Sequence, residues 1–141
     1  MEVKLGIGLG DISFGIAQDS LKDLIGKHDK IDRDNDEQLL LMYNGLKCTY
    51  WMDENGRLHW IQCSNPSLIL HNVKVIGMEV LEAVSKLALV LESSYEFEDY
   101  GSMESYSFPD YEMEVQSEYG IVTTVCFGHY WNGDEPLYTN A

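Results

Sequence analysis

Residues 41–64 read LMYNGLKCTYWMDENGRLHWIQCS, and this stretch decides the fold. The tetrapeptide at 53–56, Asp-Glu-Asn-Gly, separates two runs rich in aromatic and β-branched residues. Such a turn signal between two strand-forming runs predicts a β-hairpin. The rest of the chain must supply whatever covers it.

Two registers fit this hairpin. A two-residue turn pairs Trp51 with Trp60. A type I turn followed by a bulge pairs Met52 with Leu58 and Tyr50 with Trp60. We favour the second register because a one-residue slip would mix the two faces. It gathers a nearly unbroken apolar layer, namely Leu46, Cys48, Tyr50, Met52, Leu58 and Trp60.

The other face of the hairpin is also far from polar in this register. Its residues are Lys47, Thr49, Trp51, His59, Ile61 and Cys63. A hairpin with two apolar faces has to be covered twice, by helices of its own chain or by a partner.

Length and composition indicate one domain spanning residues 1–141. A chain of 141 residues with 45% apolar residues can bury a substantial core. No secretory signal is visible, and the apolar runs are shorter than the roughly 20 residues of a membrane helix. We therefore expect a cytoplasmic protein in which Cys48, Cys63 and Cys126 are reduced and act as small core residues.

The charge is strongly negative and unevenly spread. Residues 87–141 contain 11 acids and no Lys or Arg, whereas residues 1–86 hold the other 13 acids and all nine bases, which gives −11 and −4. A surface of one sign repels nucleic acid and anionic membranes and speeds the encounter with basic proteins. The charge therefore predicts a basic protein partner, while solubility alone is the alternative explanation.

Hydrophobic periodicity and turn signals predict two helices and up to eight strands. The helices are expected at about 17–25 and 78–92. The segment 27–38 is expected to be a charged loop, and residues 2–9 could form a short strand. Further strands are expected at about 39–43, 46–52, 57–63, 68–75, 95–97, 104–108, 111–116 and 121–130.

The order of helix then strands occurs twice, which suggests an internal repeat of about 12–75 and 76–131. The segment 14–17 matches 76–79 at a spacing of 62, and Gly56 matches Gly120 at a spacing of 64. One feature conflicts with the repeat. The apolar face chosen for the first hairpin consists of even-numbered residues and that of the second of odd-numbered residues, whereas a spacing of 64 should keep the same parity in both. The fold class is α+β: an antiparallel sheet of seven to eight strands with two helices on one face, from two helix-plus-hairpin repeats.

This pattern resembles the fold of the β-lactamase-inhibitor-protein family, which is built from tandem repeats of a helix and an antiparallel sheet. The resembling residues are Phe14, Gly15, Ile16, Leu24, Ile25, Gly26, Tyr43, Gly45, Leu46, Met52, Asp53, Gly56, Arg57, Leu58 and Ile61. Size and acidity are also similar to the immunity proteins of bacterial contact-dependent inhibition and polymorphic-toxin systems. That resemblance implies a protein that binds and neutralises one cognate toxin, often a nuclease.

No catalytic or metal-binding pattern stands out. The four histidines fall in different predicted elements, without the spacing of metal ligands. The cysteines alternate with core residues in acidic surroundings, which disfavours a reactive thiol. We therefore expect no enzyme activity, no metal and no cofactor.

Aromatic side chains threaded among acids are the best candidates for partner binding, because Tyr and Trp are enriched at binding hot spots and carboxylates pair with Lys and Arg. The candidates are Trp51, His59, Glu98, Asp99, Glu112, Glu114, Trp131, Asp134, Glu135 and Tyr138. The alternative function is a small-ligand-binding or scaffold domain that uses the 46–63 hairpin. A weak homodimer through the second face of that hairpin, rather than a monomer, is a third hypothesis.

Overall fold

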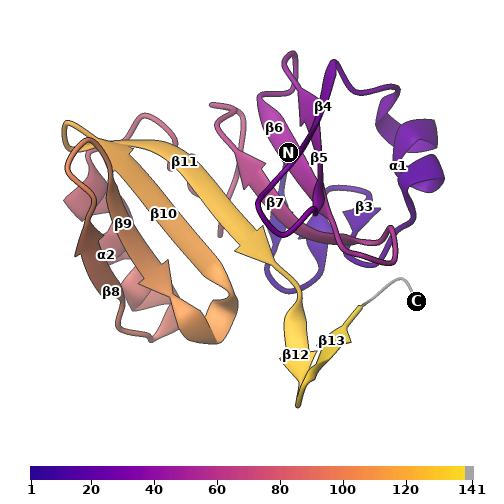
Figure 1. Ribbon diagram of the computed structural model, residues 1–141. Helices are drawn as coiled ribbons and strands as arrows, with labels where there is room; N and C mark the ends of the chain where they lie inside the picture. The colour runs from indigo at the N-terminus through magenta and orange to yellow at the C-terminus, as the bar shows by residue number, and fades with distance from the viewer. Residues whose placement is uncertain (139–141) are drawn as a thin grey trace.

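The computed structural model describes residues 1–138 and has an α+β architecture, with two α-helices and an antiparallel sheet of eight strands (Figure 1). To this extent the predicted fold class is confirmed. The strand order is β4-β5-β6-β7-β11-β10-β9-β8. The bounds are β4 (Lys30–Arg33), β5 (Leu39–Tyr43), β6 (Cys48–Met52), β7 (Leu58–Cys63), β8 (Glu96–Asp99), β9 (Glu104–Phe108), β10 (Met113–Glu118) and β11 (Ile121–Gly128).

The sheet consists of two four-stranded meanders that meet where β7 pairs with β11. Helix α1 (Gln18–Ile25) precedes the first meander, and helix α2 (Val80–Leu91) precedes the second. Figure 1 shows the two meanders as the two halves of one twisted sheet, with α2 behind the half that contains β8–β10. We call β4–β7 the first half and β8–β11 the second half.

One face of this sheet is the core. A row of directly paired, buried side chains runs along it from β5 to β9 through the junction of the halves. The row consists of Leu41, Tyr50, Ile61, Phe127, Met113 and Phe108. Leu21 of α1 and Leu87 of α2 belong to the same buried cluster. The opposite face, which we call the outer face, carries Trp51, Trp60, Gln62, Thr124, Gln116 and Glu114.

The register of the first hairpin combines the two predicted alternatives. Met52 pairs with Leu58, as the favoured register requires, and Gly56 has φ +74°. A bulge between Trp51 and Met52 then shifts the pairing, so that Trp51 lies opposite Trp60.

The favoured register was therefore wrong beyond the bulge. Ile61 and Cys63 lie in the core, and Trp60 lies on the outer face. The bulge removes the parity conflict for β7 and β11, whose buried residues match at a spacing of 64. It does not remove it for β6 and β10, whose buried residues match at a spacing of 65, as Met52 and Ser117 do. The second hairpin has its own bulge between Gln116 and Ser117.

Two other predictions were wrong. Residues 30–33, expected in a charged loop, form edge strand β4, which is exposed throughout and so lacks a hydrophobic pattern. Residues 68–75 do not form a strand, because Leu70 and Val73 exchange two backbone hydrogen bonds of 2.9 Å around a tight turn. His71 and Asn72 in that turn have φ of +47° and +65°.

The chain ends add two small sheets to the first half. Strands β1 (Val3–Lys4), β2 (Gly8–Leu9) and β3 (Ile12–Ser13) form one, and β12 (Tyr130–Asn132) with β13 (Glu135–Leu137) forms the other. The β12–β13 hairpin continues from β11 and turns away from the sheet (Figure 1). Neither helix within residues 1–138 has the length and apolar character needed to cross a membrane.

Candidate functional site

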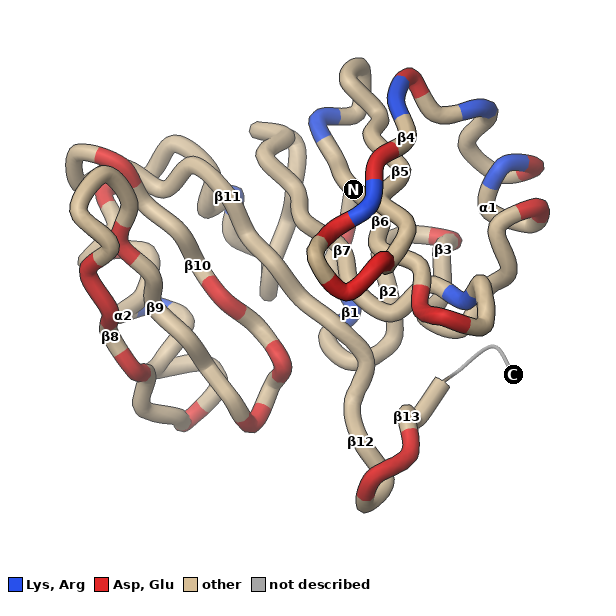
Figure 2. The backbone as a smooth tube through the Cα atoms, in the orientation of Figure 1, with Lys and Arg blue, Asp and Glu red and all other residues tan. Residues whose placement is uncertain are grey.

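An open groove lies at the end of the first half, where the β4–β5 loop, the β6–β7 turn and the β12–β13 hairpin meet. Its volume is about 560 Å³. Figure 2 shows Asp and Glu positions, in red, at all three of these connections. The residues that line the groove are Asp36, Gln38, Asp53, Glu54, Asn55, His59, His129, Trp131, Asp134, Pro136 and Tyr138.

The β6–β7 turn forms one wall because Asp53 organises it. Its Oδ1 accepts hydrogen bonds from the backbone N–H groups of Asn55 (2.8 Å) and Arg57 (2.9 Å). Its Oδ2 accepts a 2.6 Å hydrogen bond from the Tyr138 hydroxyl, 85 residues further along the chain. The carboxylate thus holds the local turn and the C-terminal segment together.

The β4–β5 loop forms the second wall in a similar way. Oδ1 of Asp34 accepts hydrogen bonds from the backbone N–H groups of Asp36 (2.9 Å) and Gln38 (2.8 Å), an arrangement typical of Asx turns. The Gln38 side chain then lies 3.0 Å from Nε2 of His59. The bulged segment of the first hairpin is therefore tied to this loop.

The floor of the groove is aromatic and is centred on His129, which is only 5% exposed. Its ring centroid lies 4.7 Å from that of Trp131, 5.0 Å from that of Tyr138 and 6.3 Å from that of His59. Nδ1 of His129 lies 2.8 Å from the Tyr130 carbonyl oxygen, at the start of β12. These contacts hold the β12–β13 hairpin against the end of the sheet.

The pKa shifts in the groove favour a charged Asp53 and a neutral His59. Burial acts to raise the pKa of Asp53, but the hydrogen bonds from Tyr138, Arg57 and Asn55 outweigh it, and the pKa lies below its ordinary value. Burial, followed by the proximity of His129, lowers the pKa of His59. Burial and the bond to Asp53 raise the pKa of the Tyr138 hydroxyl. At neutral pH the groove is therefore anionic.

Four of the ten candidate residues line this groove: His59, Trp131, Asp134 and Tyr138. Their acidic neighbours Asp36, Asp53 and Glu54 were not predicted, because the acidic excess of the C-terminal third drew attention away from the turns of the first half. The available signal was the acidic content of the two turns at 34–37 and 53–56.

The other six candidates lie elsewhere. Trp51 stacks on Trp60 on the outer face, with ring centroids 6.5 Å apart, and its Nε1 is buried without a hydrogen-bond partner. Glu114 accepts a 2.6 Å hydrogen bond from Ser105 on the same face. The remaining four are Glu98 and Asp99 on edge strand β8, Glu112 after the turn Pro109–Tyr111, and Glu135 on β13.

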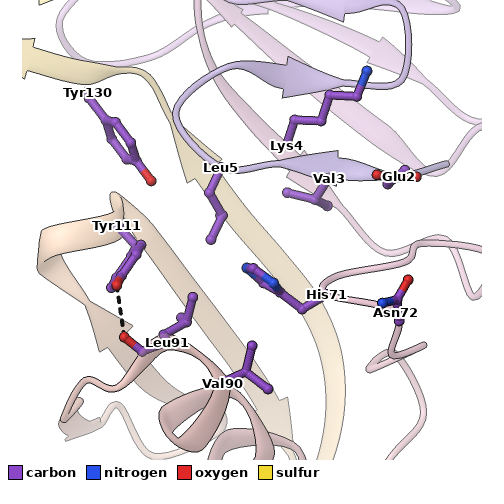
Figure 3. Close-up of a pocket in the computed structure, with 10 residues that line it drawn as sticks. All are labelled: Glu2, Val3, Lys4, Leu5, His71, Asn72, Val90, Leu91, Tyr111 and Tyr130. Carbon is purple, nitrogen blue, oxygen red and sulfur yellow. Dashed lines mark hydrogen bonds between the residues drawn. The ribbon is translucent and has the colours of Figure 1, made fainter.

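A second cavity, of about 530 Å³, lies between β1, the 71–72 turn, the end of α2 and the start of β12 (Figure 3). The Tyr111 hydroxyl donates a 2.8 Å hydrogen bond to the Leu91 carbonyl at its edge. The Leu5 and Val90 side chains give it an apolar lining, and the hydroxyl of Tyr130 points toward Tyr111 (Figure 3). It lacks the convergent charged groups of the groove, so we take the groove as the candidate site.

Comparison with known proteins yields a fold but no family. No family model matches the chain, and no curated protein matches it. The crystal structure of an extracellular protein containing an SCP domain, from Bacillus anthracis str. Ames, is similar with a TM-score of 0.57 and 12% sequence identity. The similarity covers 90% of this chain and 50% of that one, so this chain spans about half the length of the protein it matches. At this identity the likeness shows the fold alone.

Proposed function

We propose that the chain is a binding protein without catalytic activity that captures a basic segment of another protein in the acidic groove. In its full form, the proposal is a cytoplasmic immunity protein that neutralises a cognate bacterial toxin, with a nuclease as the expected target. One observation carries the proposal. The described groove lining contains four carboxylates (Asp36, Asp53, Glu54 and Asp134) and includes neither Lys nor Arg.

The groove matches the chemistry of arginine and lysine side chains. Carboxylates accept bidentate hydrogen bonds from a guanidinium group, and aromatic rings stack on it. The groove supplies both, with Trp131 53% exposed on its rim. Because it is open, it suits side chains of a large partner better than a small ligand, which binds in an enclosing cavity.

A toxin that acts on nucleic acid needs a basic surface, since phosphate contacts dominate that kind of binding. An acidic protein with net charge −15 approaches such a surface rapidly and blocks it by occupying the same basic residues. The remaining carboxylates of the second half contribute to this long-range attraction, while the groove supplies the specific contacts.

We further infer that the two halves are structural repeats. Leu58 exchanges backbone hydrogen bonds with Gly15 (2.8 Å) and Ile16 (2.9 Å). Val122, 64 residues later, exchanges hydrogen bonds of the same lengths with Gly77 and Met78. These contacts support the predicted repeat of about 12–75 and 76–131.

The binding test compares two double variants of equal net charge. Glu54→Lys with Asp134→Lys reverses two groove carboxylates, and Asp11→Lys with Glu118→Lys reverses two exposed carboxylates outside it. The probe is an immobilised arginine-rich peptide, measured at low and high salt. We expect the groove variant to bind about fivefold to tenfold more weakly, a loss of about 1–1.4 kcal/mol, and the control less than twofold. Equal losses in both variants would show that net charge alone drives binding.

Neutralisation is tested separately by searching the genes beside this one for a secreted protein with a basic C-terminal domain and co-expressing that domain with this chain. The wild-type chain should restore growth and the groove variant should not, while the control variant should. Full protection by the groove variant would place the inhibitory surface elsewhere.

A further inference from the structure

Two of the three cysteines face each other across the first hairpin. Cys48 on β6 and Cys63 on β7 are direct partners in the ladder, and their Sγ atoms are 2.9 Å apart. Both side chains are buried, with exposed fractions of 4% and 0%. No contact described for the groove involves this pair.

The backbone geometry at this position suits a covalent bond. The Ser64 N–H donates a 2.8 Å hydrogen bond to the Lys47 carbonyl, so residues 47 and 64 form a hydrogen-bonded pair. Because such pairs alternate along an antiparallel ladder, Cys48 and Cys63 form a non-hydrogen-bonded pair, in which Cα atoms are about 4.5 Å apart. That separation falls in the range of about 4.4–6.8 Å that disulfides accept.

We propose that Cys48 and Cys63 are an oxidisable dithiol that forms a cross-strand disulfide with a low-molecular-weight disulfide as oxidant. The Cys63 thiolate attacks one sulfur of the oxidant, which forms a mixed disulfide and releases one thiol. Cys48 loses its proton and attacks the Cys63 sulfur, which forms the Cys48–Cys63 bond and releases the second thiol. Two electrons pass from the protein to the oxidant.

The contact between the two sulfurs assigns their roles. The Cys48 thiol donates to the Cys63 sulfur, which lowers the pKa of Cys63 and raises the pKa of Cys48. While the hairpin is still open to the oxidant during folding, this contact favours Cys63 as the attacking sulfur, and Cys48 completes the bond as the core closes over the pair. Cys126 differs, because its ladder partners are Gln62 and Glu114 and burial raises its pKa.

The bond would join the ends of β6 and β7 that lie farthest from their turn. That hairpin carries Asp53 and His59 of the groove. Oxidation would thus restrain the hairpin without adding a group to the groove.

The proposal is tested by refolding the protein, because both thiols are buried in the native state and an oxidant does not reach them there. The full chain, reduced and unfolded in urea, is refolded in buffers of graded oxidised-to-reduced glutathione ratio, blocked with N-ethylmaleimide and digested with trypsin. Cleavage after Lys47, Arg57 and Lys74 places Cys48 and Cys63 in separate peptides, 48–57 and 58–74, and Cys126 in a third. We expect one disulfide-linked pair, 48–57 with 58–74, and a blocked Cys126.

Three variants make the result specific. The linked pair should persist in Cys126→Ser and disappear in Cys48→Ser and in Cys63→Ser. The oxidised wild type should melt about 5–10 °C above the reduced form, because the bond closes a short loop in the unfolded chain. Reduced Cys48 and Cys63 at every glutathione ratio, or linkage shared equally with Cys126, would overturn the proposal.

Discussion

The two halves of the eight-stranded sheet share a backbone design and differ on their outer faces. Each half is a four-stranded meander, and each central hairpin has a bulge just before its turn. Across the junction, Trp60 on β7 lies over Gly128 on β11. At the matching position 64 residues away, the Thr124 hydroxyl lies 2.9 Å from that of Ser64.

The difference shows which features the fold requires. The core face needs apolar side chains in both halves, and it has them at matching positions such as Leu58 and Val122. The outer face is free to differ, with stacked Trp51 and Trp60 in the first half and the polar Gln116 in the second. We therefore propose that specific recognition belongs to the first half, where the aromatic groove lies, and that the second half contributes mainly charge.

The largest effect on the free energy of unfolding is expected from a change at the junction of the two halves, where β7 pairs with β11. Phe127→Ala removes a fully buried ring that pairs with Ile61 across the junction and lies 6.1 Å from the Phe14 ring. The free energy of unfolding should fall by about 3–5 kcal/mol, because the lost contacts leave a cavity. Urea unfolding followed by far-UV circular dichroism measures the loss.

The same experiment shows whether the halves unfold together. All three tryptophans lie at 51, 60 and 131, so tryptophan fluorescence reports the first half and the β12–β13 hairpin. If the halves form one cooperative unit, fluorescence and circular dichroism should give the same midpoint. Diverging midpoints in the wild type would mean that the halves are independent.

Sequence patterns predicted the elements that bury one face. The strands at 39–43 and 104–108 have the predicted bounds, and both helices fall within two residues of theirs. Edge strand β4 was missed because a strand with both faces exposed shows no alternation of apolar and polar residues. The strand expected at 68–75 was wrong because its apolar residues are buried by a turn, not by a ladder.

The groove was only partly predictable, for a physical reason. Local patterns place Trp131 and Asp134 in a polar aromatic tail, but the groove arises because Tyr138 reaches back to Asp53. The register error had a similar origin, since nothing in the sequence signals that Trp60 packs against Gly128. Long-range contacts of this kind have no local signature.

An intermediate effect on stability is expected at the position where the outer faces of the two halves differ. At Gly128 an added Cβ would lie 2.4 Å from Cε3 of Trp60, so the ring must shift. Gly128→Ala should cost about 1–3 kcal/mol and change the near-ultraviolet circular dichroism of the Trp51–Trp60 stack. Gly45→Ala is the control, because an added Cβ there has open space around it. An unchanged spectrum in Gly128→Ala would refute the packing of Trp60 on β11.

The smallest effect on stability is expected from removing a tyrosine–carboxylate hydrogen bond, and each half offers one such pair for comparison. Tyr138 donates to Asp53 at 2.6 Å in the half-buried groove, and Tyr100 donates to Glu98 at 2.5 Å on the exposed edge of the second half. Tyr138→Phe should lower the free energy of unfolding at pH 7 by about 0.5–1.5 kcal/mol. Tyr100→Phe should leave it unchanged, because water replaces an exposed hydrogen bond.

The pH dependence identifies the group responsible. The Asp53 pKa is depressed in the folded state, so its stabilisation is present above the unfolded value of about 3.9 and is lost as the pH falls through the folded pKa. Tyr138→Phe should raise the pKa of Asp53, as measured by carboxyl NMR, and its stability difference from the wild type should shrink in acid. Equal losses from both tyrosine variants, or a difference that persists in acid, would show that the C-terminal segment is not held by Asp53.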